Sequence, residues 1–351
     1  MTGKSPLISI IIPIFNGANW IKRCFDSILS QSAIGILDLE ICVCNDSSTD
    51  NTHALLKHWQ ETFEQVGIPL RIFNNCTLPG GVGFAKNKAI SLSRGEFLCF
   101  QDIDDVMLPD RILKQYNRAC HSPKDMIIGC RFTREPSDST VRYTKWANSL
   151  SQSQLDLQVF TSNGPTVIMP TWFLHRSVYE RVDGFVESTK GIPEDLIFFN
   201  KHLDLGGKVC RVDEYLLIYT FHLNQTTFSI HESTIWNLRV ERLERVVLKN
   251  WQQFTIWNAG KQGRKLFNSL RVENKKKVTA MCDVDKNKIG HKYKPYYPDD
   301  KIAGPELNIV HYGDALPPFV ICVKMDLTGG VFEKNLKELN LKEGVEYIMF
   351  S

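Results

Sequence analysis

Several features that would assign a protein class are missing from this 351-residue sequence. The longest apolar run near the N-terminus, LISIIIPIF, is too short to span a bilayer, and Lys4 is the only cationic residue before it. This run therefore reads as a buried strand rather than a signal peptide or a membrane anchor. The ten cysteines form no CxxC pair and show no Cys/His spacing typical of zinc sites. We expect free thiols in a reducing compartment, and hence a cytoplasmic protein.

Short apolar segments alternate with amphipathic ones from about Leu7 to Phe100. The pattern predicts an α/β fold with a mainly parallel sheet, because such alternation is typical of βαβ units. The strands are expected at residues 8–15, 39–46, 70–75 and 96–104, and the helices at 19–32, 49–65 and 80–93.

Three of the expected strands end in conspicuous polar residues, namely Asn16, Asp46 and Asp102. Open sheets of this kind bind ligands in the crevice beyond the carboxyl ends of their strands. We therefore expect a nucleotide site at the edge that these three residues share.

The run QDIDDV places Asp102, Asp104 and Asp105 directly behind the apolar segment EFLCF. Three acids at the end of a buried strand are costly unless a cation balances them. Mn²⁺ or Mg²⁺ holding a nucleotide diphosphate would do so, and no glycine-rich phosphate loop precedes the strand to take that role instead. A solvated turn rich in Asp is the alternative interpretation.

Four segments, in this order, resemble the family 2 glycosyltransferases with the GT-A fold. They are SIIIPIFNG, VCNDSSTDNT, GVGFAKNKAISLSRGEFLCFQDIDD and DGFVESTKGIPEDLIFF, and the resemblance spans roughly residues 7 to 230. It implies a mixed, mainly parallel sheet between helices. It also implies an enzyme that moves a sugar from a nucleotide diphosphate donor with inversion.

The resemblance assigns roles to particular residues. Asp46 would recognise uracil, Asp102 and Asp104 would hold the ribose and the metal-bound diphosphate as a DxD motif, and His222 would complete the metal site. Asp195 would be the catalytic base, at a helix N-terminus where a carboxylate stays ionised. The remaining residues that it places in the donor pocket are Pro13, Asn16, Lys86, Asn87 and Trp172.

Structural roles stay open for several of these residues. Asp46 fits equally well as a turn residue that opens the following helix. Glu194 and Asp195 could simply favour a helix start, a lone histidine such as His222 is more often structural, and Trp172 could belong to the core.

The C-terminal part has a different charge balance. Residues 239–301 contain 16 Lys or Arg against 7 Asp or Glu, whereas the whole chain has a net charge of +3. The runs Lys275–Lys277 and Lys292–Lys294, with Tyr293, Tyr296 and Tyr297, mix cations with aromatic rings in a way that suits RNA. A solvated basic surface is the alternative.

The tail also shows its own alternation of strands and helices, which predicts a small Rossmann-like α/β domain at 251–351 after a catalytic domain at 1–250. Gly260 and Gly263 suggest a phosphate turn, although the full GxGxxG pattern is missing.

The segments WNAGKQGRKL and CDVDKNKIG extend the resemblance to family members that galactosylate queuosine in tRNA. This implies transfer of galactose from UDP-galactose to the cyclopentene-diol of queuosine at the wobble position of tRNA(Tyr). The residues alone do not distinguish galactose from N-acetylglucosamine, or queuosine-modified tRNA from a glycan or protein acceptor. A non-catalytic protein that binds a sugar nucleotide or tRNA is the third alternative.

Overall fold

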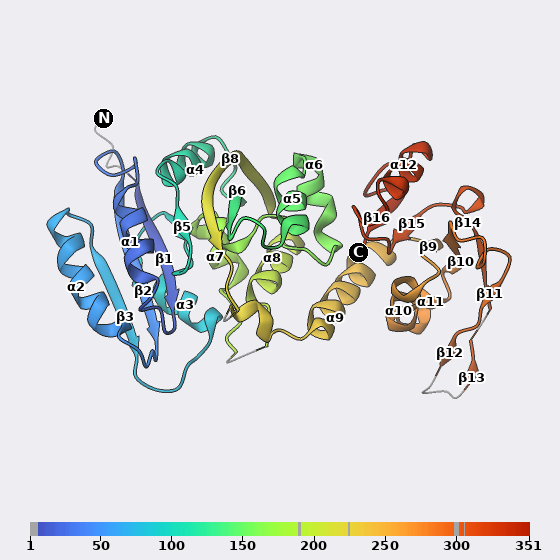
Figure 1. Cartoon of the computed structure of the whole chain (residues 1–351), viewed down its shortest axis with the longest axis horizontal. Helices are drawn as coiled ribbons and strands as arrows, with labels where there is room; N and C mark the ends of the chain where they lie inside the picture. The colour runs from blue at the N-terminus through green and yellow to red at the C-terminus, as the bar shows by residue number, and fades with distance from the viewer. Residues whose placement is uncertain (1–5, 189–190, 224, 298–301, 305) are drawn as a thin grey trace. The chain divides into compact units, whose positions relative to one another are not determined.

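The structure is a computed structural model that describes residues 6–188, 191–223, 225–297, 302–304 and 306–351. The chain divides into two compact units (Figure 1). The first contains the chain up to Asp156 together with Pro165–His231, and the second contains Leu157–Gly164 and Glu232–Ser351. The functional division that we predict at residue 250 stays a prediction.

The first unit is built on an eight-stranded sheet with helices packed against it (Figure 1). Its strands are β1 (Leu7–Ile14), β2 (Asp38–Asp46), β3 (Leu70–Asn75), β4 (Phe97–Phe100), β5 (Val106–Met107), β6 (Met126–Glu135), β7 (Phe173–His175) and β8 (Lys208–Thr220). Its helices are α1 (Ile21–Leu29), α2 (Thr52–Gln65), α3 (Val82–Leu92), α4 (Arg111–Cys120), α5 (Val141–Ser149), α6 (Gln152–Leu157), α7 (Arg176–Val182) and α8 (Glu194–Asp204), with 3₁₀ turns η2 (Met169–Thr171) and η3 (Thr226–Ser229).

The strand order is β3-β2-β1-β4-β7-β6-β8-β5. Strands β3, β2, β1 and β4 run parallel, β7 is antiparallel to both of its neighbours, and β6 pairs with β8 in parallel. The sheet is therefore mixed, which confirms the expected α/β fold. The apolar run that begins at Leu7 is the inner strand β1, and Ile8, Ile10, Ile11 and Ile12 on it are fully buried, because helices cover both faces of such a strand.

The fourth expected strand is shorter than predicted, and this affects the site. We expected the fourth strand to continue through Asp104, but β4 ends at Phe100 and the acid run lies in a turn. The backbone N–H of Asp105 donates to the Asp102 carbonyl at 3.2 Å, and the Gln101 amide donates to the Asp102 and Asp105 carbonyls. On a strand, successive side chains point to opposite faces of the sheet, so Asp104 and Asp105 would point apart. In a turn, the carboxylates of the acid run can lie close together.

The second unit contains a six-stranded sheet in the order β11-β14-β10-β9-β15-β16. Its strands are β9 (Phe254–Trp257), β10 (Val278–Asp283), β11 (Lys292–Tyr293), β14 (Leu307–His311), β15 (Phe319–Ile321) and β16 (Tyr347–Met349), beside the separate hairpin of β12 (Tyr296–Tyr297) and β13 (Ile302–Ala303). Its helices are α9 (Glu232–Leu243), α10 (Lys261–Ser269), α11 (Val272–Lys275) and α12 (Val331–Glu338), with the short turns η1 (Gln158–Phe160), η4 (Glu244–Leu248) and η5 (Tyr312–Asp314).

All strands of this sheet except β11 are parallel, and Trp257 packs on Phe319 and Phe332 in its core. The sheet agrees with the expected α/β character, and its assignment as Rossmann-like stays a prediction. Within the described part of the chain, no helix has both the length and the apolar character needed to cross a membrane.

Close packing of α10 on β9 generates a stability prediction. A Cβ atom added at Gly263 would lie 1.8 Å from the Asn258 carbonyl oxygen, so the helix would have to move. We expect Gly263→Ala to lower the free energy of unfolding by about 1–3 kcal/mol, the usual cost of overpacking, as measured by chemical denaturation. Lys261→Ala in the exposed first turn of the same helix is the control. Equal stability of the two variants would contradict the prediction.

Candidate active site

The acid turn, defined here as Asp102, Asp104 and Asp105, follows the carboxyl end of β4. One carboxylate oxygen from each residue lies within 4.8 Å of the others, so the three could hold one cation. Burial raises the pKa of Asp102 to about 7; Lys86 opposes this rise, and the Asp104 carboxylate adds to it. The turn therefore carries like charges at close range in a partly buried place. Mn²⁺ and Mg²⁺ prefer such oxygen ligands, and the donor set fits either ion.

His222 reaches the same turn from the segment that follows β8. Its Nε2 atom lies 2.8 Å from Asp104 Oδ2, and its ring stacks on Trp20 at a centroid separation of 5.0 Å. The structure thus brings together Asp104 and His222, two residues 118 positions apart that the resemblance placed at one metal. Trp20 was missed in the sequence analysis, although an aromatic residue in the polar segment between β1 and α1 was available as an indication.

Asp105 connects the two elements that carry these ligands. Its Oδ1 atom accepts a hydrogen bond from the Thr220 backbone N–H at 2.9 Å, two residues before His222. Its Oδ2 atom is buried and has no hydrogen-bond partner among the described residues. Burial raises the pKa of Asp105 well above its ordinary value, and the carboxylates of Asp104 and Asp102 add to the rise. An orphaned buried oxygen beside two further carboxylates fits a site that binds a cation.

Asp195 lies in the first turn of α8, as predicted. Burial raises its pKa to about 6; the neighbouring Glu194 carboxylate adds to the rise, Lys86 opposes it, and the backbone N–H of Leu196 donates to Oδ1 at 2.7 Å. A carboxylate with a pKa near 6 is ionised at neutral pH and accepts a proton more readily than an ordinary aspartate.

Lys86 joins the surroundings of Asp195 to the acid turn. Its ammonium lies 2.7 Å from Glu194 Oε1, and both side chains are largely buried. Burial lowers the pKa of Lys86, but Glu194, Asp102 and Asp195 outweigh burial, and the pKa is raised overall. The buried pair ties α3 to α8, and its positive charge acts on both Asp102 and Asp195.

Asp46 and Asn16 hold loops at the carboxyl edge of the sheet. Asp46 Oδ1 accepts from the Asn75 amide and the Gly80 N–H, and Oδ2 accepts from the Gly81 N–H at 2.9 Å. Asn16 Oδ1 accepts from the Thr49 N–H at 2.8 Å. Asp46 thus contacts the loop before α3 rather than the helix that follows it in sequence, and its role toward uracil stays a prediction.

The other residues that the resemblance places in the donor pocket lie in different surroundings. Trp172 is fully buried against Phe198 and Phe199, which fits the core alternative. The Asn87 amide donates to the Phe185 carbonyl, and Pro13 lies within β1. Their donor contacts remain predictions.

The basic C-terminal residues are partly engaged inside the second unit. Lys292 and Lys294 both pair with Glu306 at 3.0 Å, and the Arg239 guanidinium is buried. Tyr293 packs on Phe267, whereas the side chains of Tyr296 and Tyr297 lie outside the described residues. The charge excess of the sequence therefore overstates the charge available to an external anion.

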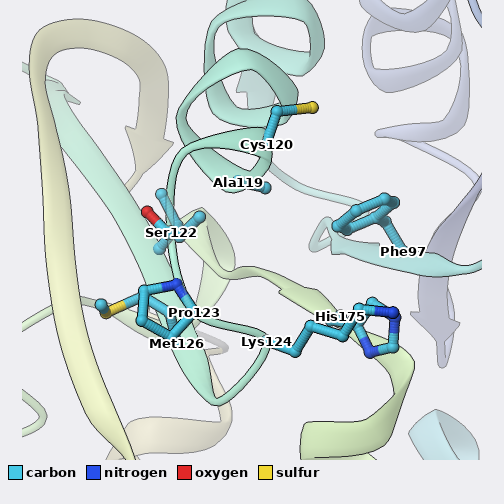
Figure 2. Close-up of a pocket in the computed structure, with 9 residues that line it drawn as sticks. Phe97, Ala119, Cys120, Ser122, Pro123, Lys124, Met126 and His175 are labelled. Carbon is cyan, nitrogen blue, oxygen red and sulfur yellow. The ribbon is translucent and has the colours of Figure 1, made fainter.

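The first unit also contains a small pocket (Figure 2). It lies at the N-terminal end of β4, whereas the acid turn follows the C-terminal end of this strand. It has a volume of about 160 Å³ and is bordered by Phe97 and Met126, the first residues of β4 and β6, together with Cys120 and His175. Typical ligand pockets are several hundred Å³. This pocket is thus too small and too remote to be part of the carboxylate site.

Comparisons with known proteins address the family and the fold of the chain. The model of Glycosyl transferase family 2 matches residues 9–183. The chain is 29% identical to a chondroitin synthase of Pasteurella multocida over 214 residues, which are 59% of this chain and 20% of that protein. It thus spans about a fifth of the length of this curated relative.

Two solved structures share the fold. Staphylococcus aureus TarS 1-349 in complex with UDP-GlcNAc matches 75% of this chain and 70% of its own, with a TM-score of 0.51 and 18% identity. The mannosyltransferase PcManGT from Pyrobaculum calidifontis, in complex with GDP-Man and Mn²⁺, matches 70% of this chain and 65% of its own, also with a TM-score of 0.51 and 18% identity. The chain belongs to glycosyltransferase family 2 and has the α/β GT-A fold.

Proposed function

We propose that this protein is an inverting, metal-dependent glycosyltransferase that transfers galactose from UDP-galactose to the cyclopentene-diol of queuosine at the wobble position of tRNA(Tyr). The observation that carries the chemistry is the convergence of the acid turn with His222, next to a base of raised pKa at Asp195. The acceptor is proposed on the sequence resemblance of the C-terminal segments.

The donor half of the proposal rests on the acid turn. Asp102, Asp104 and His222 would hold Mn²⁺ or Mg²⁺, and this ion would neutralise charge on the diphosphate as it leaves. Solved relatives of the same fold contain UDP-GlcNAc, or GDP-Man with Mn²⁺, which supports a nucleotide-sugar donor. Asp46 and Asn16 lie at the same edge of the sheet, where the nucleoside would bind.

Asp195 accepts the proton of the acceptor hydroxyl as the hydroxyl oxygen attacks the anomeric carbon. The bond from that carbon to the diphosphate oxygen breaks on the opposite face, and its electron pair stays with the departing nucleotide. One direct displacement of this kind inverts the configuration, so an α-linked donor gives a β-linked product. Lys86 positions the base because its ammonium binds the adjacent Glu194.

The acceptor half of the proposal rests on WNAGKQGRKL and CDVDKNKIG. These segments include the end of β9 with α10, and the end of β10 with the loop after it. We propose that the second unit is Rossmann-like and docks tRNA, using basic side chains that are not paired internally. Lys276 is exposed and is one candidate.

A glycan acceptor with UDP-N-acetylglucosamine as the donor is the second candidate function. The named relative is a chondroitin synthase, and this name favours a saccharide acceptor. A non-catalytic binding role has less support, because the acid turn and the base at Asp195 together provide the groups that sugar transfer requires.

The acceptor is tested with labelled donors and total tRNA prepared with and without queuosine. We expect label from UDP-galactose, in the presence of Mn²⁺, to enter only the queuosine-containing tRNA, and UDP-N-acetylglucosamine to give none. Label from UDP-N-acetylglucosamine on a saccharide acceptor, with no label on tRNA, would instead establish the second candidate.

Removal of the base should separate binding from chemistry. We expect Asp195→Asn to lower kcat by about 10²–10⁴-fold, the usual contribution of general base catalysis, with little change in UDP-sugar affinity. Steady-state kinetics and calorimetry measure the two quantities. Asp204→Asn, at the exposed C-terminal end of the same helix, is the control. Ordinary turnover by the Asp195 variant would remove this residue from the mechanism.

Removal of a metal ligand should instead weaken donor binding. Asp104→Ala loses the carboxylate that contacts His222, so we expect the affinity for UDP in the presence of Mn²⁺ to fall at least tenfold. Titration calorimetry with and without the metal measures this change. Asp138→Ala, an exposed acid in the same unit, serves as the control. The metal assignment fails if both variants respond to Mn²⁺ as the native protein does.

A further inference from the structure

Arg134 lies one residue before the end of β6 and is surrounded by aromatic rings. Its guanidinium carbon lies 3.7 Å from the ring centroid of Tyr219, its cross-strand partner on β8. The rings of Phe132 and Tyr143 lie 5.7 and 5.8 Å from the same carbon. These contacts hold the guanidinium in one orientation, because the face of each ring attracts the cation.

Two polar atoms of this guanidinium are not satisfied. Arg134 Nε and Nη1 are buried, and neither has a hydrogen-bond partner within the described ranges of the chain. Arg111, by contrast, uses its Nε, Nη1 and Nη2 atoms in four hydrogen bonds. A buried donor without an acceptor costs free energy, so a native protein that keeps one has a reason to do so.

Arg134 lies beside the segment of β8 that contacts the acid turn. The next residue, Glu135, pairs with Thr220 on β8, and the Thr220 N–H donates to Asp105 Oδ1 at 2.9 Å. The charge of Arg134 also acts on Asp105. The Asp195 carboxylate acts on Tyr143, whose pKa burial raises. Arg134 is thus electrostatically coupled to the acid turn, and its neighbour Tyr143 to the proposed base.

The acid turn presents carboxylates, which repel a diphosphate unless positive charge accompanies them. A metal ion held by the acid turn would supply part of that charge, and a fixed guanidinium with free N–H groups can supply the rest. Arginine keeps its charge when it is partly buried, because its ordinary pKa lies far above neutral pH.

We propose that Arg134 binds the diphosphate of the bound nucleotide sugar by donating hydrogen bonds from Nε and Nη1. When the bond between the anomeric carbon and the diphosphate oxygen breaks, its electron pair remains on that oxygen, and Arg134 stabilises the added charge without transferring a proton. Tyr219 and Tyr143 position the guanidinium. The inference rests on the proposed UDP-sugar donor.

The test compares two substitutions at Arg134 with one at Arg131. Arg134→Met keeps a long apolar side chain against the rings but removes the charge, and Arg134→Lys keeps the charge but removes the guanidinium. Arg131→Met is the matched control, because Arg131 lies on the same strand, has an unsatisfied buried Nε, and pairs with Asp213 at 3.4 Å. Thermal unfolding of each variant establishes that it is folded.

UDP affinity in the presence of Mn²⁺, measured by calorimetry, is the first readout, and the KM values for donor and acceptor are the second. We expect Arg134→Met to weaken UDP binding at least tenfold, Arg134→Lys to weaken it less, and Arg131→Met to change it less than twofold. The acceptor KM should not change in any variant.

Three outcomes would overturn the inference, and they are distinguishable. If the native protein binds UDP and Arg134→Met binds it equally well, Arg134 does not contact the diphosphate, although the proposed function stands. If only the acceptor KM rises, the partner of Arg134 is a phosphate of the acceptor. If the native protein binds no UDP with Mn²⁺, the proposed donor fails, and the inference fails with it.

Discussion

Repulsion among the carboxylates at the carboxyl edge of the first sheet is the constraint on which the site depends. Asp102, Asp104 and Asp105 lie within one turn, and burial prevents water from screening them fully. The protein offsets this cost with a hydrogen bond from the Thr220 N–H to Asp105 and with the contact of His222 with Asp104. The same contacts hold the end of β8 beside the turn that follows β4. The two contacts that stabilise the acids therefore also bring the residues of the site together.

A buried ion pair extends this arrangement to the helix that carries Asp195. The ammonium of Lys86 binds Glu194, and its charge also acts on Asp102 and Asp195. Such a pair adds little to stability, because desolvation offsets most of its attraction, but loss of one partner leaves an uncompensated buried charge. Here the pair acts by positioning, because it fixes α8 against α3. It thereby keeps Asp195, in the first turn of α8, close enough to interact electrostatically with the acid turn.

In the second unit, internal contacts reduce the positive charge that is available to an external ligand. Its excess of lysine and arginine suggested a face for RNA, but Lys292 and Lys294 share Glu306, and Arg239 packs on the ring of Phe350. Cations used in this way no longer contribute their full charge to long-range attraction. An RNA surface on this unit must therefore be built from the remaining exposed basic residues.

The sequence alone predicted the α/β fold, because apolar periodicity and strand length are local properties. The strands β1, β2 and β3 agree closely with the residues expected for them, and the acid run was recognisable from its position behind an apolar strand. The resemblance named Asp104 and His222 together, but only the folded chain places their side chains 2.8 Å apart.

Other roles were decided only by tertiary structure. The pairing of Lys86 with Glu194, the full burial of Trp172 and the unsatisfied guanidinium of Arg134 each depend on neighbours far away in the chain. Sequence patterns report which residue types recur at which spacing, whereas burial and hydrogen-bond satisfaction depend on what packs across an element. For that reason the sequence determined the fold class and the acids of the site, and the tertiary structure decided which charges are paired and which remain free for a ligand.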